Sequence, residues 1–288
     1  MIPNSFDYHR PESVKDAVAL LAEHGDEARA IAGGHSLIPM MKLRMADVAH
    51  LVDLQAIDDL RGIAVDGDTV TIGAMTTQHE LIASDALAKA APIIREAALQ
   101  IADPQVRYVG TVGGNVANGD PGNDMPALMM CLGATYSVTG PDGSRDIAAR
   151  DFYQGAYFTA LEHGEILTAV RIPIPSPDHG YAYEKLKRKV GDYATAAAAV
   201  VITMADGKCT SASIGLTNVS ETPLWASDAA AMLVGTSLDK ASVDAAVAAA
   251  EAITEPASDM RGPAEYRTKM AGVMMRRALE RAQSRAKG

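Results

Sequence analysis

The chain has 288 residues, of which 48% are hydrophobic and 22% are charged, and its formal net charge is -10. This length and composition are typical of a globular protein with a sizeable core, most simply divided into two domains. The excess of 36 acidic over 26 basic residues argues against binding to nucleic acid or to anionic lipid, because both carry dense negative charge.

The first 60 residues are predicted to alternate between helix and strand. Ser13 is placed to cap a helix, and residues 28–32 form a short apolar strand. A Gly-Gly pair follows, Ser36 looks like the cap of a second helix, and residues 51–54 form another strand. Strand, helix and strand in this order predict a small parallel βαβ unit.

Residues 56–177 predict a larger and mostly antiparallel sheet with helices. The segment 109–124 is rich in Gly, Asn and Asp and is expected to be a long polar loop. A proline-rich stretch at 173–177 is the best candidate for a linker. The expected elements are strands over 69–73, 136–138 and 166–174, and helices over 77–84, 86–101 and 126–132.

The rest of the chain predicts a three-stranded antiparallel sheet followed by a bundle of three helices. The pair Asp206-Gly207 is a strong signal for a hairpin between two of the strands. The strands are expected over 181–189, 194–204 and 209–218, and the helices over 224–234, 240–252 and 263–285. The prediction is therefore an α+β protein with domains 1–177 (subdomains of about 1–55 and 56–177) and 178–288.

Cysteine content and the lengths of the apolar segments indicate the cellular compartment of the protein. Cys131 and Cys209 are too few for a disulfide framework or for the four thiolates of an iron–sulfur cluster. The first ten residues lack the apolar core of a signal peptide. The most apolar stretch, 194–205, is half alanine and too short to span a bilayer. We therefore expect a cytoplasmic protein with no transmembrane segment.

Several well-known site motifs are missing. The chain has no P-loop, no G-x-G-x-x-G and no H-E-x-x-H, and the seven histidines are scattered along it. The segment Gly34–Ile38 is similar to a nucleophile elbow but lacks its closing glycine. No metal site and no catalytic acid, base or nucleophile is therefore predicted.

The first of two glycine motifs runs from Ala32 through Gly33, Gly34 and His35 to Ser36. Paired glycines between a strand and a helix let backbone N–H groups approach a ligand, and a helix N-terminus favours a phosphate. Ser36 is suited either to cap the helix or to donate to a phosphate oxygen. An ordinary strand–turn–helix corner would carry the same residues.

The second motif lies within residues 110–124. Its backbone N–H groups can also bind an anion, and its polar side chains suit sugar or ribityl hydroxyls. A polar loop without a ligand is the alternative. Both motifs lie within one domain, about 80 residues apart, which favours a pyrophosphate held from two sides. The motif contains Gly110, Thr111, Val112, Gly113, Gly114, Asn115, Asn118, Asp120 and Asp124.

These two motifs resemble the phosphate-binding loops of flavoproteins in the molybdenum hydroxylase group. Over essentially its full length the chain is similar to the FAD-binding medium subunits of aerobic carbon monoxide dehydrogenases. Segments 6–11, 101–105, 119–124 and 180–201 carry this closer similarity. The resemblance implies a two-loop FAD-binding fold, a flavoprotein C-terminal domain, and FAD that is bound without a covalent link.

The resemblance also implies cofactor contacts for individual residues. Asp124 would bind the ribityl chain, and Ile101 and Ala102 would line the adenine or ribityl region. Leu161 and Leu167 would be apolar wall residues, although Leu167 alone equally suits the core. The implied FAD site consists of Ala32, Gly33, Gly34, His35, Ser36, Leu37, Ile101, Ala102, Gly110, Thr111, Gly113, Gly114, Asn115, Asn118, Asp124, Leu161, Leu167, Lys185 and Tyr193.

Three of these residues have plain structural alternatives. Lys185 would stabilise negative charge near the pyrimidine edge of the flavin, or belong with residues 187–189 to one solvated strand face. Tyr193 would pack on the flavin ring, or lie in the core with its hydroxyl satisfied. Asp124 is also placed to cap the helix before Pro126.

The resemblance implies an electron-transfer function. A large partner subunit with a molybdenum–copper pterin centre would oxidise CO, and a small partner would pass the electrons through two [2Fe–2S] clusters. The FAD of this chain would deliver them to an external acceptor, a quinone in such enzymes. The implied assembly is a dimer of three-chain units in the cytoplasm, with the inner face of the membrane as a further place for the complex.

Other functions fit parts of the sequence. The same flavin subunit would serve a hydroxylase for xanthine, nicotinate or an aromatic acid, because the substrate site lies on a different chain. A scaffold protein with two incidental glycine loops would contain no flavin. A stand-alone flavin oxidase would need an acid–base pair for its substrate, and the sequence offers no obvious one.

Overall fold

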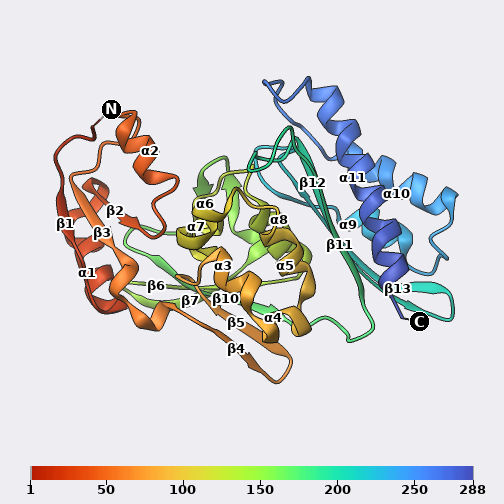
Figure 1. The fold of residues 1–288 in the computed structure, drawn as a ribbon, viewed down its shortest axis with the longest axis horizontal. Helices are drawn as coiled ribbons and strands as arrows, with labels where there is room; N and C mark the ends of the chain where they lie inside the picture. Colours follow the sequence, from red (N-terminus) through yellow and green to blue (C-terminus); the bar gives the residue numbers. More distant parts are fainter. Residues whose placement is uncertain (1, 288) are drawn as a thin grey trace.

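The computed structural model describes residues 2–287 and places three units along the long axis of the molecule (Figure 1). The N-terminal unit has a three-stranded parallel sheet, the middle unit a five-stranded antiparallel sheet, and the C-terminal unit a four-stranded antiparallel sheet. The predicted α+β fold, with a small parallel unit and larger antiparallel sheets, is confirmed. Within residues 2–287, helices that are both long and apolar enough for a membrane span are absent.

The N-terminal unit is built around β3, which is parallel to both of its neighbours in the order β1-β3-β2. Helix α1 begins as predicted, since Ser13 Oγ accepts a hydrogen bond from the amide of Asp16 at 3.1 Å. Val18 and Leu21 of this helix share a buried core with Val52 of β3. The elements are β1 (Asp7–His9), α1 (Val14–His24), β2 (Ala28–Ile31), α2 (Leu37–Lys42) and β3 (His50–Asp53).

The middle unit has the strand order β4-β5-β10-β6-β7, with antiparallel neighbours throughout. A separate two-stranded ribbon, β8-β9, follows β7 in the chain. The strands are β4 (Ile63–Asp66), β5 (Thr69–Gly73), β6 (Thr135–Gly140), β7 (Gly143–Ala148), β8 (Tyr153–Gly155), β9 (Phe158–Thr159) and β10 (Ile166–Pro173). Short 3-10 segments occupy Gly25–Glu27, Leu54–Ala56, Asp58–Leu60 and Ala149–Asp151.

Two predictions for the helices of this unit are wrong. The single helix expected over 86–101 is interrupted at Ala91, whose backbone leaves the helical region because Pro92 follows it. The polar loop expected over 109–124 contains a helix whose N-cap is Thr111. The helices are α3 (Gln78–Ala83), α4 (Asp85–Ala90), α5 (Pro92–Ala98), α6 (Pro104–Val109), α7 (Val112–Ala117) and α8 (Asp124–Cys131).

The C-terminal sheet has the order β11-β12-β13-β14. It contains the three predicted strands and one short addition, because residues 224–225 form a strand rather than the start of a helix. The elements are β11 (Gly180–Leu186), β12 (Ala196–Ala205), β13 (Lys208–Thr217), β14 (Leu224–Trp225), α9 (Ser227–Leu233), α10 (Lys240–Ala252) and α11 (Ala264–Arg285).

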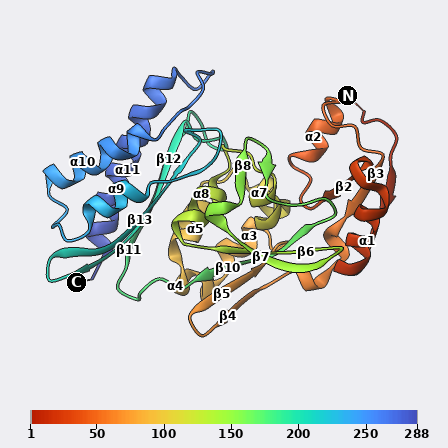
Figure 2. The ribbon, with the colours of Figure 1, turned by 180° about the vertical axis from the view of Figure 1, so that it is seen from behind.

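Helices cover both faces of this sheet, which explains the alanine-rich sequence of β12. Helices α9–α11 lie on its outer face, and α5 and α8 of the middle unit lie on its inner face (Figure 2). Ala197 and Ala199 are buried in the core of the middle unit, whereas Ala196 and Ala198 are buried under the outer helices. A Cβ on Gly215 would lie 2.2 Å from the carbonyl oxygen of Ala127 in α8, so only small residues allow this close packing.

Candidate functional site

A cavity of about 720 Å³ lies where the three units meet. Its size falls within the range of roughly 300–1,000 Å³ that is usual for ligand and cofactor pockets. Every residue that the sequence assigned to the FAD site contributes to its lining. These residues are Ala32, Gly33, Gly34, His35, Ser36, Leu37, Ile101, Ala102, Gly110, Thr111, Gly113, Gly114, Asn115, Asn118, Asp124, Leu161, Leu167, Lys185 and Tyr193.

The first glycine motif forms the turn between β2 and α2 at one side of the cavity. Gly34 has a φ of +72°, in the left-handed region that favours glycine. A Cβ on Gly33 would lie 2.6 Å from the carbonyl oxygen of Val109, so this glycine lets the two loops pack directly against each other. Ser36 occupies the N-cap position of α2, but its side chain makes no capping hydrogen bond. The capping role suggested for Ser36 is therefore wrong.

The two motifs differ in the donors they offer to a ligand. Within the described chain, the backbone N–H groups of residues 33–37 have no hydrogen-bond acceptor. In the second motif, the amide of Gly113 donates to the carbonyl of Ala74 at 2.8 Å, and that of Gly114 donates to Thr111 Oγ1 at 3.0 Å. The first loop thus presents free backbone donors, whereas these two amides of the second loop hold the loop together.

Two polar side-chain atoms at the cavity have no partner within residues 2–287. They are the amide nitrogen Nδ2 of Asn118 and the amide oxygen Oε1 of Gln78, and both are buried. Buried polar groups in folded proteins are nearly always hydrogen-bonded, because leaving one unpaired costs about 1–3 kcal/mol. Asn118 Nδ2 and the free amides of the first loop suit acceptor atoms of a ligand, whereas Gln78 Oε1 suits a donor. A polar ligand that carries both kinds of atom, such as FAD, fits this set.

A buried ion pair connects α8 to β11 at another side of the cavity. Lys185 Nζ lies 2.7 Å from a carboxylate oxygen of Asp124, and the two side chains are 1% and 6% exposed. The hydroxyl of Tyr183 donates to the other carboxylate oxygen of Asp124. Burial raises the pKa of Asp124, while Lys185 and Tyr183 oppose that rise.

This arrangement decides two of the alternatives left open by the sequence. Lys185 is buried, so it does not belong to a solvated strand face. The N-cap of α8 is Asn123, and the Asp124 carboxylate points to Lys185 and Tyr183, so a capping role for Asp124 is wrong. Sequence reasoning missed Tyr183, although it lies two residues before Lys185 and therefore on the same face of β11.

Tyr193 lies at the edge of the cavity rather than in the core. Its side chain is 42% exposed, and its ring packs on Gly122, where a Cβ would lie 2.7 Å from Tyr193 Cδ1. The guanidinium of Arg261 lies 5.7 Å from the centre of the ring. The interpretation of Tyr193 as a core residue is therefore wrong.

Other lining residues were not predicted, because they carry no motif of their own. Gln78 becomes recognisable only when its unpaired buried oxygen is seen. Tyr157 has a φ of +61°, which is rare for a residue with a side chain. The lining also includes Arg29, Ala30, Ile31, Met40, Ala46, Leu54, Ala74, Met75, Gln78, Val106, Ala117, Gly122, Asn123, Tyr157, Glu165, Ile166, Gly191 and Asp192.

Comparisons with known proteins assign the chain to a class of flavoprotein. A family model described as the FAD binding domain in molybdopterin dehydrogenase matches residues 4–175. A second model, the CO dehydrogenase flavoprotein C-terminal domain, matches residues 181–282. The chain therefore belongs to the family of FAD-binding subunits of molybdopterin dehydrogenases that includes the medium chains of carbon monoxide dehydrogenase.

Individual relatives match over their whole length. The carbon monoxide dehydrogenase medium chain of Afipia carboxidovorans is 71% identical over 287 residues, covering 100% of both chains. A structure of the carbon monoxide dehydrogenase of Hydrogenophaga pseudoflava has a TM-score of 0.99 at 50% identity, covering 100% of both chains. Quinoline 2-oxidoreductase from Pseudomonas putida 86 has a TM-score of 0.94 at 35% identity, covering 99% of both chains.

Substitution of Gly33 tests the packing between the two loops. Gly33→Ala is expected to weaken FAD binding by roughly tenfold or more, because its Cβ would force the loops apart, and overpacking costs about 1–3 kcal/mol. Flavin fluorescence measures the affinity, and circular dichroism checks the fold. Gly155→Ala is the matched control, since its Cβ would meet only Phe158 at an ordinary 3.7 Å. Equal FAD affinity in the two variants would contradict this role of Gly33.

Proposed function

We propose that this chain is the FAD-carrying electron-transfer subunit of a carbon monoxide dehydrogenase. The observation that carries the proposal is the 71% end-to-end identity to a carbon monoxide dehydrogenase medium chain. The hydroxylase that acts on quinoline shares the fold but only 35% of the sequence. The close relationship favours CO as the substrate of the complex over an aromatic compound, xanthine or nicotinate.

Different residues of the cavity would contact different parts of the cofactor. The free amides of residues 33–37 would donate to the pyrophosphate, and Asn118 and Gln78 would pair with polar groups of FAD. Lys185, held in place by Asp124, would set the charge beside the flavin ring. Bound FAD exchanges electrons singly or in pairs, which suits a relay between one-electron and two-electron centres. No side chain of this chain has to act as an acid, a base or a nucleophile.

The remaining assignments extend the same proposal. FAD binds without a covalent bond, and residue 177 marks the boundary between the FAD-binding and C-terminal domains. Electrons arrive from the [2Fe–2S] clusters of a small partner chain, after a large molybdenum-containing chain has oxidised CO. They leave to an external acceptor, a quinone, in a complex that is a dimer of three-chain units. The complex resides in the cytoplasm or at the inner face of its membrane.

The substrate is tested with the assembled complex. The chain would be co-expressed with the large and small subunits of its complex, and the purified complex would be supplied with CO, xanthine, nicotinate or quinoline under anaerobic conditions. Reduction of a soluble quinone is followed optically. We expect turnover with CO at more than about a hundred times the rate with any of the other three. Faster turnover with one of those would assign the chain to another hydroxylase.

A further inference from the structure

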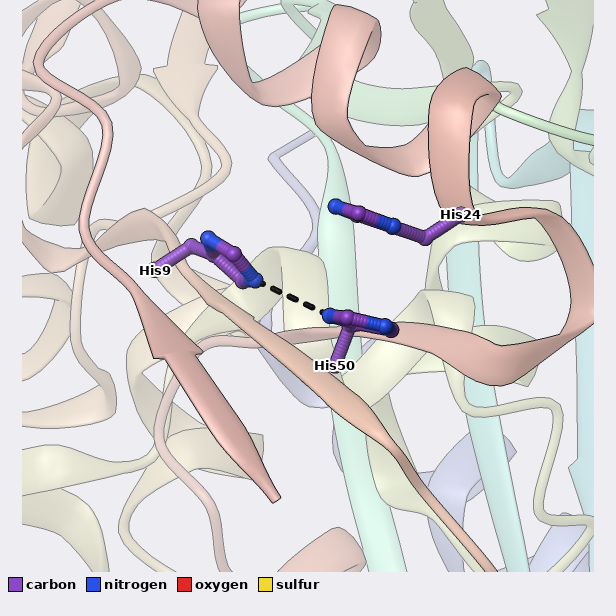
Figure 3. A group of neighbouring side chains, drawn as sticks. All are labelled: His9, His24 and His50. Carbon is purple, nitrogen blue, oxygen red and sulfur yellow. Dashed lines mark hydrogen bonds between the residues drawn. The ribbon is translucent and has the colours of Figure 1, made fainter.

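Three of the seven histidines, scattered in the sequence, meet on one side of the N-terminal sheet (Figure 3). His9 is the last residue of β1, His24 the last residue of α1, and His50 the first residue of β3. His9 Nε2 lies 3.1 Å from His50 Nδ1, and one ring nitrogen of each of the three lies within 4.8 Å of the others. All three residues are partly buried, so solvent still reaches the group.

Strand register and helix packing explain why these three side chains lie close together. In the parallel pair β1–β3, Asp7 lies opposite His50. Side chains two residues apart in a strand share a face, so Asp7 and His9 lie on the same side as His50 and Val52. Helix α1 packs against Val52 on that side, and its last residue, His24, therefore reaches the same place. The cluster is fixed by the architecture of the unit and not by a flexible loop.

The cluster is separate from the proposed FAD site. None of the three histidines lines the large cavity. His50 begins β3 beside Ala28, the first residue of β2, whereas the first glycine motif follows the last residue of β2. His50 thus lies at the end of the sheet away from the glycine loop, and His9 lies on β1, which β3 separates from β2. Any function of the cluster is independent of a direct contact with the flavin.

Two of the three rings already have the spacing of a metal site, and the third lies next to them. Two nitrogens that bind one tetrahedral zinc ion at about 2.0–2.1 Å are separated by roughly 3.3 Å, close to the distance between His9 and His50. The His24 ring stacks on His50 with centroids 3.7 Å apart and an interplanar angle of 7°, so it must turn to aim a nitrogen at the same point. Asp7 Oδ2, at 4.0 Å from His50 Nδ1, adds a negative charge.

We propose that His9, His24 and His50 form a binding site for a divalent transition-metal ion, with zinc as the expected occupant. Neutral imidazole nitrogens are good ligands for zinc, copper and nickel, and a three-histidine set leaves a further position for water or for Asp7. Because the ligands come from β1, α1 and β3, the ion would clamp these three elements together. The bound metal would therefore stabilise the N-terminal unit.

The first test measures zinc binding by the full FAD-loaded chain after treatment with a chelator. Isothermal titration with Zn²⁺ alone is expected to show one ion per chain with micromolar or tighter affinity. His9→Gln, His24→Gln and His50→Gln should each weaken binding by more than about tenfold. His79→Gln is the matched control, since this partly buried ring packs against Tyr108 outside the cluster and its loss should leave the affinity unchanged. Absence of saturable binding, or equal affinity in all variants, would overturn the proposal.

A second test needs no substitution and decides the question even if a variant fails to fold. Diethyl pyrocarbonate modifies accessible imidazole nitrogens that are not bound to a metal, and mass spectrometry locates each modified residue. With Zn²⁺ present, modification of His9, His24 and His50 should fall several-fold, while that of His79 and His163 should not change. A melting midpoint that rises by roughly 5 °C when the zinc concentration is a hundred times its Kd would also support metal binding. Unchanged modification of the three histidines would reject the site.

Discussion

Replacing Asp124 with alanine is expected to lower the free energy of unfolding by about 3–5 kcal/mol, because the ammonium of Lys185 is then buried without its counter-charge. Lys185 cannot escape to solvent, since its side chain is 1% exposed. Its other acceptor, the carbonyl of Gln100 at 3.3 Å, carries no net charge. The hydroxyl of Tyr183 would also lose its acceptor. Urea titration, followed by circular dichroism, measures the change.

A second ion pair in the same chain provides the matched control. Arg171 and Asp146 lie 3.1 Å apart on the surface, with side chains 50% and 49% exposed. Exposed pairs contribute about 0–1 kcal/mol, so Asp146→Ala should hardly move the urea midpoint. If Asp124→Ala were no more damaging than Asp146→Ala, the buried pair would not have the structural role that its geometry indicates.

The double variant Asp124→Leu/Lys185→Met separates stability from the effect on the flavin. Replacing both charges by apolar side chains of similar size should restore most of the lost stability, because no unpaired charge remains in the core. In the proposed site it also removes Lys185 and its counter-charge together, so the net charge beside the flavin ring is unchanged. FAD bound to the double variant should then keep a midpoint potential close to that of the wild type. A large shift of the potential would contradict this and would mean that the ring senses one of the two charges much more strongly than the other.

The sequence predicted which residues line the cavity better than it predicted which of their groups are free to bind a ligand. The two glycine motifs were found because Gly-Gly pairs between predicted elements are locally visible. The sequence could not reveal that the amides of Gly113 and Gly114 are already bonded inside the chain, because Ala74, the partner of Gly113, lies on a distant segment. That division of donors between the loops depends on tertiary structure.

Errors in the secondary structure have local physical causes. The alternation of apolar and polar side chains over 86–101 is that of one helix. Pro92, however, disfavours the helical conformation of Ala91, so the helix is interrupted there. The glycines and asparagines of 109–124 predicted a loop, whereas capping by Thr111 and burial of Val112 and Val116 hold six of these residues in a helix. The histidine cluster was invisible for another reason: strand register, not sequence spacing, brings His9 and His50 together.

The isolated chain, loaded with FAD and kept free of oxygen, should show no reduction of its flavin under CO. The reason lies in what the chain contains: its two cysteines, both buried, are too few for an iron–sulfur cluster. The cavity where the three units meet has free amides, asparagines and a lysine at its walls. These groups suit a charged cofactor and have no means of activating a small apolar gas.

Dithionite is the positive control, because it reduces accessible flavin directly and should bleach the same sample. Addition of the large and small partner subunits should then make the flavin reducible by CO, at a rate that rises with the fraction of assembled complex. The absorbance of the flavin near its visible maximum follows both steps. Bleaching by CO without partners would mean that this chain activates CO itself, and the electron-relay function would have to be abandoned. Bleaching only after assembly would instead place the oxidation of CO on a partner and the collection of its electrons on this chain.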